Sequence, residues 1–231
     1  MPDENVTDAE EVALYLSAGD SDEYKLAQIG FEPDVIYDIG ADVGSVTMFA
    51  NRTYPNAKIV SVEPNPWSFR HLSKHADGIP EIVPIHAAAG VGQMYEPTKA
   101  EPLHWMVVGR ESPSWHDGLK KSDIPSVTLG ELHKSHGGVQ YVVKIDCESA
   151  EYGILTHPDS RQMILGCSYF AAEFHYWGRT HDGMMVVVNA LELFLFELAQ
   201  THTVYSYAYG ACKHVWAKRR IDNSVEGMDW K

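Results

Sequence analysis

From residue 34 onward, short apolar runs alternate with stretches in which apolar residues recur at helical spacing. The short runs predict buried strands over residues 35–37, 59–62, 81–86, 141–145 and 169–174. The helical spacing predicts helices over residues 45–53, 67–75, 129–133, 150–155 and 182–199. Residues 203–208 and 214–217 alternate like an antiparallel pair. This order favours an α/β fold with a mostly parallel sheet, helices on both faces and an antiparallel pair closing the sheet.

One α/β domain is expected over residues 31–220, with a C-terminal tail over 221–231. Thr7 and Glu10 match a helix capping box, and a second short helix is expected from Glu23 to Ile29. Residues 1–30 are therefore interpreted as an N-terminal helical cap. Residues 91–125 contain four prolines and are expected to form loops with a hairpin.

The net charge of the chain limits the kinds of partner that it can bind. The chain has 231 residues and a net charge of −14. So acidic a surface repels phosphate backbones, and nucleic acid is not expected as a partner. The three cysteines form neither a disulfide framework nor a zinc motif. The N-terminus does not have the pattern of a signal peptide. The apolar stretch 184–199 contains two glutamates, so a buried helix is favoured over a membrane span. We therefore expect a soluble cytoplasmic protein.

The loop after the first predicted strand contains Asp38, Gly40, Asp42 and Gly44. In parallel sheets, ligands bind outside the carboxyl ends of the strands, so this loop is a candidate site. Gly40 permits a sharp turn and Gly44 a close start of the helix. Asp42 puts a negative charge where a diphosphate would lie, which favours a cationic ligand such as S-adenosylmethionine. A plain strand–turn–helix with two glycines is the structural alternative.

Glu63 follows the second predicted strand, 23 residues beyond Gly40. This spacing is close to that of a ribose-binding acid in a βαβ unit, and a carboxylate can accept from two adjacent hydroxyls. A surface glutamate before a proline turn is the alternative. Together with the glycine turn, the nucleoside-binding interpretation is favoured.

Three carboxylates, those of Asp146, Glu148 and Glu151, follow the fourth predicted strand. They are candidates for substrate chemistry, although the two glutamates could instead stabilise the start of the next helix through its dipole. Lys144 lies inside the apolar strand and needs a buried partner, for which a strand carboxylate is expected.

At the end of the fifth predicted strand, Glu173 and His175 alternate onto one face. A histidine near a hydroxyl could act as a general base, and a structural role is the alternative. His71 and His75 have the i, i+4 spacing of metal ligands, but the sequence offers no third ligand nearby. A solvated helix face is favoured for that pair, and no metal site is predicted.

Three blocks, in order, resemble the FkbM family of S-adenosylmethionine-dependent methyltransferases. They are residues 30–44 (GFEPDVIYDIGADVG), 62–66 (VEPNP), and 127–129 (VTL) followed by 143–152 (VKIDCESAEY). The similarity spans roughly residues 27–220. The family usually has Asn at the position of Asp42 and Gly at that of Ser149.

The resemblance implies a Rossmann-like class I methyltransferase fold with seven strands, the last one antiparallel. It implies methyl transfer from S-adenosylmethionine to an oxygen of a small-molecule or glycan acceptor. The residues expected to bind the cofactor lie at the strand ends: Asp38, Gly40, Ala41, Asp42, Gly44, Glu63, Pro64, Ala87, Ala88 and Asp146. Among them, Glu63 is expected to hold the ribose and the two alanines to lie near the adenine. Asp146, Glu173 and His175 are the candidates for removing the acceptor's proton.

Two other functions are compatible with parts of this pattern. A nicotinamide-dependent oxidoreductase would share the strand, glycine turn and downstream acid, but the charge of Asp42 opposes it. A non-catalytic binding protein that retains the cofactor fold would account for the departures at Asp42 and Ser149.

Overall fold

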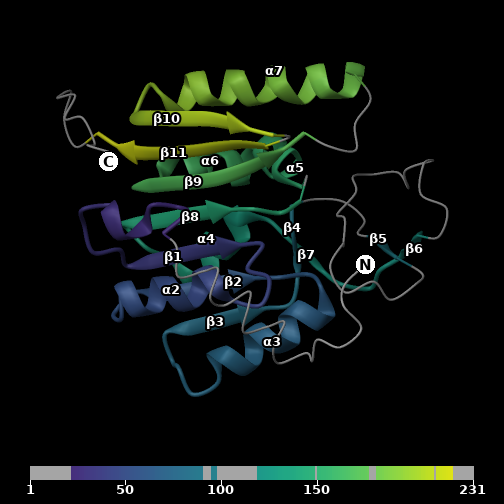
Figure 1. Ribbon diagram of the computed structural model, residues 1–231. Coiled ribbons are helices and arrows are strands. Elements are labelled where there is room, and N and C mark those ends of the chain that lie inside the picture. The colour runs from purple at the N-terminus through teal and green to yellow at the C-terminus, as the bar shows by residue number, and fades with distance from the viewer. Residues whose placement is uncertain are drawn as a thin grey trace.

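The sheet has seven strands in the order β10-β11-β9-β8-β1-β2-β3 (Figure 1). The computed structural model describes residues 22–90, 95–97, 119–148, 150–176, 181–210 and 212–220. The strands are β1 (Val35–Ile39), β2 (Lys58–Val62), β3 (Ile82–Ile85), β8 (Tyr141–Ile145), β9 (Tyr169–His175), β10 (His202–Tyr209) and β11 (Cys212–Arg219). Strands β3, β2, β1, β8 and β9 run parallel, and β11 is antiparallel to both of its neighbours. The predicted fold class is confirmed, with β11 inserted between β9 and β10.

Most helices begin and end close to the predicted limits, but the helix expected from Glu23 to Ile29 is a three-residue 3₁₀ helix, and one helix is added. They are the short 3₁₀ helix η1 (Leu26–Gln28), α2 (Ser45–Thr53), α3 (Pro66–Ala76), α4 (Leu129–His136), α5 (Glu151–Thr156), α6 (Pro158–Gly166) and α7 (His181–Leu198). Helix α6 was not predicted, and it begins directly after the extended residue His157. Two N-termini are capped by side chains: Asn65 accepts from the backbone N–H groups of Trp67 and Ser68, and Thr128 forms a capping box with Glu131.

Two apolar clusters lie on opposite faces of the sheet. Neighbouring residues of the central strands point into different clusters: Ile36 and Val142 into one, Tyr37 and Val143 into the other. These strands are buried along their whole length. That is why their sequences are apolar on both faces, apart from Asp38 and Lys144, rather than alternating.

The region predicted as loops with a hairpin, residues 91–125, is flanked by one short strand pair and contains another. Strand β4 (Ala88–Ala89) pairs in parallel with β7 (Ser126–Val127), and β5 (Tyr95–Pro97) pairs antiparallel with β6 (Leu119–Lys121). Residues 91–94 and 98–118 of that region, the first 21 residues of the predicted cap and the predicted tail lie outside the described residues. Among the described residues, no helix has the length and apolar character needed to cross a membrane.

The described part of the N-terminal segment packs against the domain. Tyr24, Leu26 and Ile29 are buried in the cluster that also contains Tyr54 and Tyr169. The hydroxyl of Tyr54 donates to the carbonyl of Leu26 at 2.7 Å, and that of Tyr169 donates to the carbonyl of Tyr24 at 2.9 Å. This anchoring holds Tyr24 near the carboxyl ends of the strands, where it contacts Asp146.

Candidate functional site

A buried ion pair supports the loop that follows β1. Asp38 lies directly opposite Lys144 on the neighbouring strand β8. Its Oδ1 is 3.0 Å from Lys144 Nζ, and its Oδ2 accepts from Thr47 Oγ1 at 2.7 Å. Burial lowers the pKa of Lys144, but the charges of Asp38 and Asp146 outweigh burial and raise the pKa above its ordinary value. The strand carboxylate predicted as the partner of Lys144 is therefore confirmed and is Asp38.

The turn at Gly40 can be made only by glycine. Its φ is +75°, and a Cβ at this position would lie 1.7 Å from the carbonyl oxygen of Asp146. The N–H groups of Gly40 and Ala41 both donate to the carbonyl of Val62, at 2.9 and 3.0 Å. Lys144 Nζ donates to the carbonyl of Gly40 at 2.7 Å. The turn is thus fixed to the carboxyl ends of β2 and β8 at once.

Asp42 joins this loop to the beginning of α3. Its φ is 49°, in the left-handed region that Asp tolerates better than most residues. Its side chain accepts from Ser68 Oγ at 2.6 Å, and its N–H donates to Glu63 Oε2 at 2.8 Å. Gly44, with φ +100°, precedes α2 and lies close to α3. A Cβ added to Gly44 would lie 3.0 Å from the side chain of Leu72. The side chain of Asp42 is therefore fixed by α3.

Glu63 lies at the carboxyl end of β2 and is only 7% exposed. Its Oε1 accepts from the N–H of Asn65 at 2.7 Å, and its Oε2 from the N–H of Asp42 at 2.8 Å. Burial raises the pKa of Glu63 to about 7. Each carboxylate oxygen has a second lone pair, so the group retains capacity to accept from a ligand.

The residues expected near an adenine follow the carboxyl end of β3. Ala87 and Ala88 are both buried, and Ala88 belongs to β4. Beside them, His86 Nε2 donates to the carbonyl of Pro64 at 3.0 Å. The His86 ring stacks on Phe69 with centroids 4.5 Å apart. The half-buried aromatic pair of His86 and Phe69 was not predicted, although His86 ends a predicted strand and Phe69 lies in the first turn of a predicted helix.

Four carboxylates surround the imidazole of His175 at the carboxyl ends of β8 and β9. Nδ1 lies 3.1 Å from Glu151 Oε1. Nε2 faces Glu173 Oε1 at 3.6 Å, Glu148 Oε2 at 3.7 Å and Asp146 Oδ1 at 3.9 Å. The predicted approach of Glu173 and His175 on one face of the sheet is confirmed.

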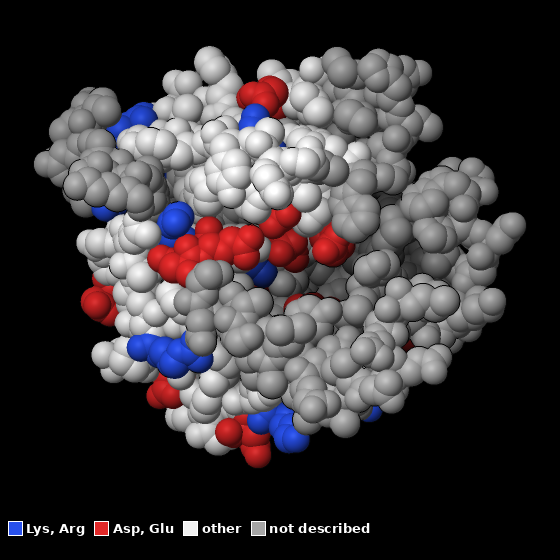
Figure 2. Space-filling model, in the orientation of Figure 1, with Lys and Arg blue, Asp and Glu red and all other residues white. Residues whose placement is uncertain are grey.

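These carboxylates determine the charge of His175. Burial lowers the pKa of His175, but the hydrogen bond with Glu151 and the charges of Glu151, Asp146 and Glu148 outweigh it and raise the pKa to about 9. A row of acidic side chains crosses this side of the molecule, and the surface is hollowed beside it (Figure 2). The site is therefore electronegative.

The fold of this chain is similar to the folds of solved methyltransferase structures. No protein-family model matches the chain, and no curated protein matches it. A solved structure described as an rRNA-methylase from Clostridium thermocellum has a TM-score of 0.51 and 10% identity, covering 88% of this chain and 96% of that chain. The fold is that of the Rossmann-like methyltransferases.

Two further methyltransferase structures are similar over most of the chain at lower TM-scores. A precorrin-6y C5,15-methyltransferase from Geobacter metallireducens GS-15 has a TM-score of 0.44 and 13% identity, covering 95% of this chain and 93% of that chain. A protein described as an O-methyltransferase from Klebsiella pneumoniae has a TM-score of 0.45 and 11% identity, with 95% and 83% covered.

Within this methyltransferase fold, the predicted site residues form two connected groups. The glycine loop and Glu63 form one, joined by the N–H of Asp42. Asp146, Glu173 and His175 form the other, and Gly40 packs against the backbone of Asp146 where the groups meet. Ser149 lies outside the described residues.

Several side chains of the second group were not predicted as site residues. The hydroxyl of Tyr24 donates to Asp146 Oδ2 at 2.8 Å, and its ring lies 5.2 Å from Lys144 Nζ. Cys212 lies directly across from His175, and His214 directly across from Glu173, in the pairing of β11 with β9. These contacts join distant parts of the chain. The strand alternation would have revealed Cys212 and His214 only if the register of the pair had been known.

Proposed function

We propose that this chain is an S-adenosylmethionine-dependent methyltransferase that methylates a hydroxyl of a small molecule or sugar. The observation that carries the proposal is the bond between Glu63 and the glycine loop. A buried carboxylate at the end of β2 accepts from the N–H of Asp42, beside a turn that only glycine can make. A buried carboxylate beside the glycine turn supports the proposal, because its remaining lone pairs can accept from two ribose hydroxyls, which suits a nucleoside.

The charge of the site supports the same cofactor. Asp42 on the loop and Asp146 and Glu173 at the neighbouring strand ends are acidic. A negative environment attracts a sulfonium and an ammonium and repels the diphosphate of a nicotinamide cofactor. When bound, S-adenosylmethionine supplies a methyl group activated by the sulfonium. In the proposed complex Glu63 holds the ribose, the segment from Asp38 at the end of β1 to Gly44 approaches the methionine portion, and Pro64, Ala87 and Ala88 lie on the adenine side.

The acceptor hydroxyl must lose a proton, and three groups are candidates to take it. Asp146, Glu173 and His175 lie at adjacent strand ends, with 3.6 to 3.9 Å between the His175 Nε2 and the carboxylate oxygens. A correctly placed base contributes about 10²- to 10⁴-fold to a reaction of this kind. Alignment of donor and acceptor supplies much of the remainder.

Membership of the FkbM family is the finer part of the proposal. The three sequence blocks support it, and two of them correspond to the two connected groups of the site. Residues 30–44 contain the glycine loop, and residues 143–152 contain Lys144 and Asp146. The departure at Asp42 is accommodated by the hydrogen bond from Ser68.

The proposed setting is a cytoplasmic domain spanning residues 31–220 that acts on a small molecule rather than on nucleic acid. All three cysteines are free thiols, which suits a reducing compartment. The net charge of −14 opposes binding to a phosphate backbone.

Calorimetric titration with S-adenosylhomocysteine, with NADH as the control ligand, tests the cofactor. We expect binding of the first alone. Glu63→Gln should weaken it by about 1.5–3 kcal/mol, because a charge-assisted acceptor is lost, which is about 10- to 150-fold in Kd. Glu32→Gln is the matched control, since Glu32 is exposed and lies before the amino end of β1. The absence of both heat and thermal stabilisation at saturating S-adenosylhomocysteine would refute the proposal.

Product formation tests the reaction. The chain is incubated with S-adenosylmethionine and panels of hydroxylated small molecules, sugars and RNA, and S-adenosylhomocysteine is measured. We expect turnover with a hydroxylated acceptor and none with RNA. Glu173→Gln should lower kcat while leaving the Kd for S-adenosylhomocysteine unchanged. Cofactor binding without turnover on any panel would favour the non-catalytic binding protein.

A further inference from the structure

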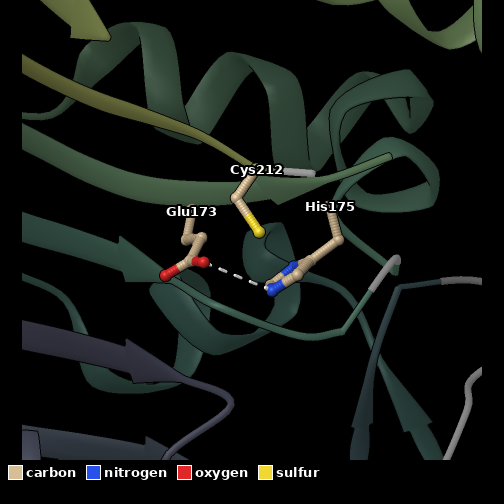
Figure 3. A group of neighbouring side chains, drawn as sticks. All are labelled: Glu173, His175 and Cys212. Carbon is tan, nitrogen blue, oxygen red and sulfur yellow. Dashed lines mark ion pairs between the residues drawn. The ribbon is translucent and has the colours of Figure 1, made fainter. Parts of the chain in front are cut away.

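Three donor atoms of different chemistry converge beside the carboxyl end of β9. They are a carboxylate oxygen of Glu173, a ring nitrogen of His175 and the thiol sulfur of Cys212, and all lie within 4.8 Å of one another. Figure 3 shows the three side chains pointing toward a common centre. Glu173 and His175 are two residues apart on β9, and Cys212 lies directly opposite His175 on β11. Alternation along one strand and direct pairing across two strands therefore place all three on one face of the sheet.

We propose that Glu173, His175 and Cys212 bind a zinc ion. Thiolate, imidazole and carboxylate are the ligands that zinc takes in proteins, whereas magnesium and calcium take oxygen ligands. Three protein ligands leave one position of a tetrahedral ion open, as in catalytic zinc sites. The inference concerns metal binding and does not rest on the proposed methyl transfer. With the ion bound, Glu173 and His175 serve as its ligands, and Asp146 remains the candidate base.

The spacing of the donors suits an ion at their centre. His175 Nε2 and Glu173 Oε1 are 3.6 Å apart, which is longer than an N–H···O hydrogen bond. Two ligand atoms bound at 2.0–2.1 Å to a tetrahedral zinc ion are separated by about 3.4 Å. The pair is thus close to the separation that coordination requires, and a small movement of side chains completes it.

A buried carboxylate orients the histidine for this role. Glu151 is fully buried, and its Oε1 lies 3.1 Å from His175 Nδ1. The N–H of Cys147 donates to the same Glu151 oxygen at 2.8 Å and so fixes its position. With the Nδ1 proton directed at Glu151, the Nε2 lone pair is directed at the cluster once the metal displaces its proton. Metal-binding histidines commonly have such a carboxylate behind them.

The surrounding charge also favours a cation. Asp146 Oδ1 and Glu148 Oε2 lie 3.9 and 3.7 Å from His175 Nε2, on the same side as Glu173. A divalent ion would neutralise carboxylates that otherwise repel one another across a half-buried site. The ligands come from two strands, and that is why the sequence contains no recognisable zinc spacing.

Cobalt titration of the full-length, chelator-treated protein tests the site, because a Co²⁺–thiolate bond gives a near-ultraviolet charge-transfer band. We expect a single equivalent of Co²⁺ to produce the band and Zn²⁺ to abolish it by displacement. Cys212→Ser should remove the band and weaken binding at least about tenfold. Cys147→Ser is the matched control, because this thiol is close by but is not one of the three ligands, and it should keep the band. Circular dichroism establishes that each variant is folded.

Glu173→Gln is the second variant, and it should weaken Co²⁺ binding while retaining the band. The wild type failing to produce the band would overturn the assignment, as would a band that survives in Cys212→Ser or disappears in Cys147→Ser. Binding of S-adenosylhomocysteine, measured on the same Cys212→Ser sample, should be unchanged. Failure of the zinc site and failure of the cofactor proposal are thereby distinguished.

Discussion

Replacing Lys144 by Met should destabilise the protein strongly, because it leaves a buried carboxylate without its cation. The side chains of Lys144 and Asp38 are 3% and 0% exposed, and Nζ lies 3.0 Å from Oδ1. Removing one partner of a buried ion pair costs about 3–5 kcal/mol. The variant also loses the hydrogen bond from Nζ to the carbonyl of Gly40, so the cost is greater than that of a surface pair. At this chain length the loss corresponds to a decrease of about 6–20 °C in Tm.

Urea denaturation followed by circular dichroism measures this change in the free energy of unfolding. Lys58→Met is the matched control, because Lys58 begins the adjacent strand β2 and is exposed, and it should change stability by about 0.5 kcal/mol or less. The double variant Asp38→Asn, Lys144→Met should recover most of the stability, since no uncompensated charge remains. The reasoning is refuted if Lys144→Met costs less than about 1 kcal/mol, or if the double variant is as unstable as the single one.

Three further predictions concern the glycine loop, the ribose-binding carboxylate and a helix cap. Gly40→Ala should lower the Tm far more than Gly78→Ala does. Both glycines have positive φ, but an added Cβ would lie 1.7 Å from a backbone oxygen at Gly40 and has no atom within 4 Å at Gly78. Equal Tm values for the two variants would contradict this prediction. Affinity for S-adenosylhomocysteine should rise as the pH is raised through about 7, because the pKa of Glu63 is about 7 and the ionised carboxylate accepts the ribose hydrogen bonds. Calorimetry across this pH range should find no such rise in Glu63→Gln. Thr128→Ala should cost about 1 kcal/mol through loss of the capping box without changing ligand affinity, and an unchanged urea midpoint would argue against the cap.

The central strands and the first helix could be predicted because local signals decide them. Residues 141–145 and 45–53 have the predicted limits. A short run rich in Val and Ile, such as residues 141–145, is typical of a strand buried on both faces. Helix α6 was missed because residues 158–166 include few apolar positions, Met163 and Ile164 among them, although a proline at the first helical position is itself a helix start signal.

The candidate site was predictable only to the extent that it follows strand ends. Asp146 and Glu173 follow from the rule that ligands bind at the carboxyl edge of a parallel sheet. Tyr24 and Cys212 do not, because their positions depend on how distant segments pack. No periodicity in the sequence shows that β11 pairs with β9 in the register that sets Cys212 opposite His175.

The insertion of β11 between β9 and β10 governs the order in which the molecule can be assembled during synthesis. The ribosome produces β9 before β11, so until β11 emerges the nascent chain has β9 as a mostly apolar strand with one edge unpaired. The hairpin of β10 and β11 must emerge before that edge is covered and before Cys212 can reach the site. Chains shortened before β11 are therefore expected to aggregate rather than to fold into a smaller domain.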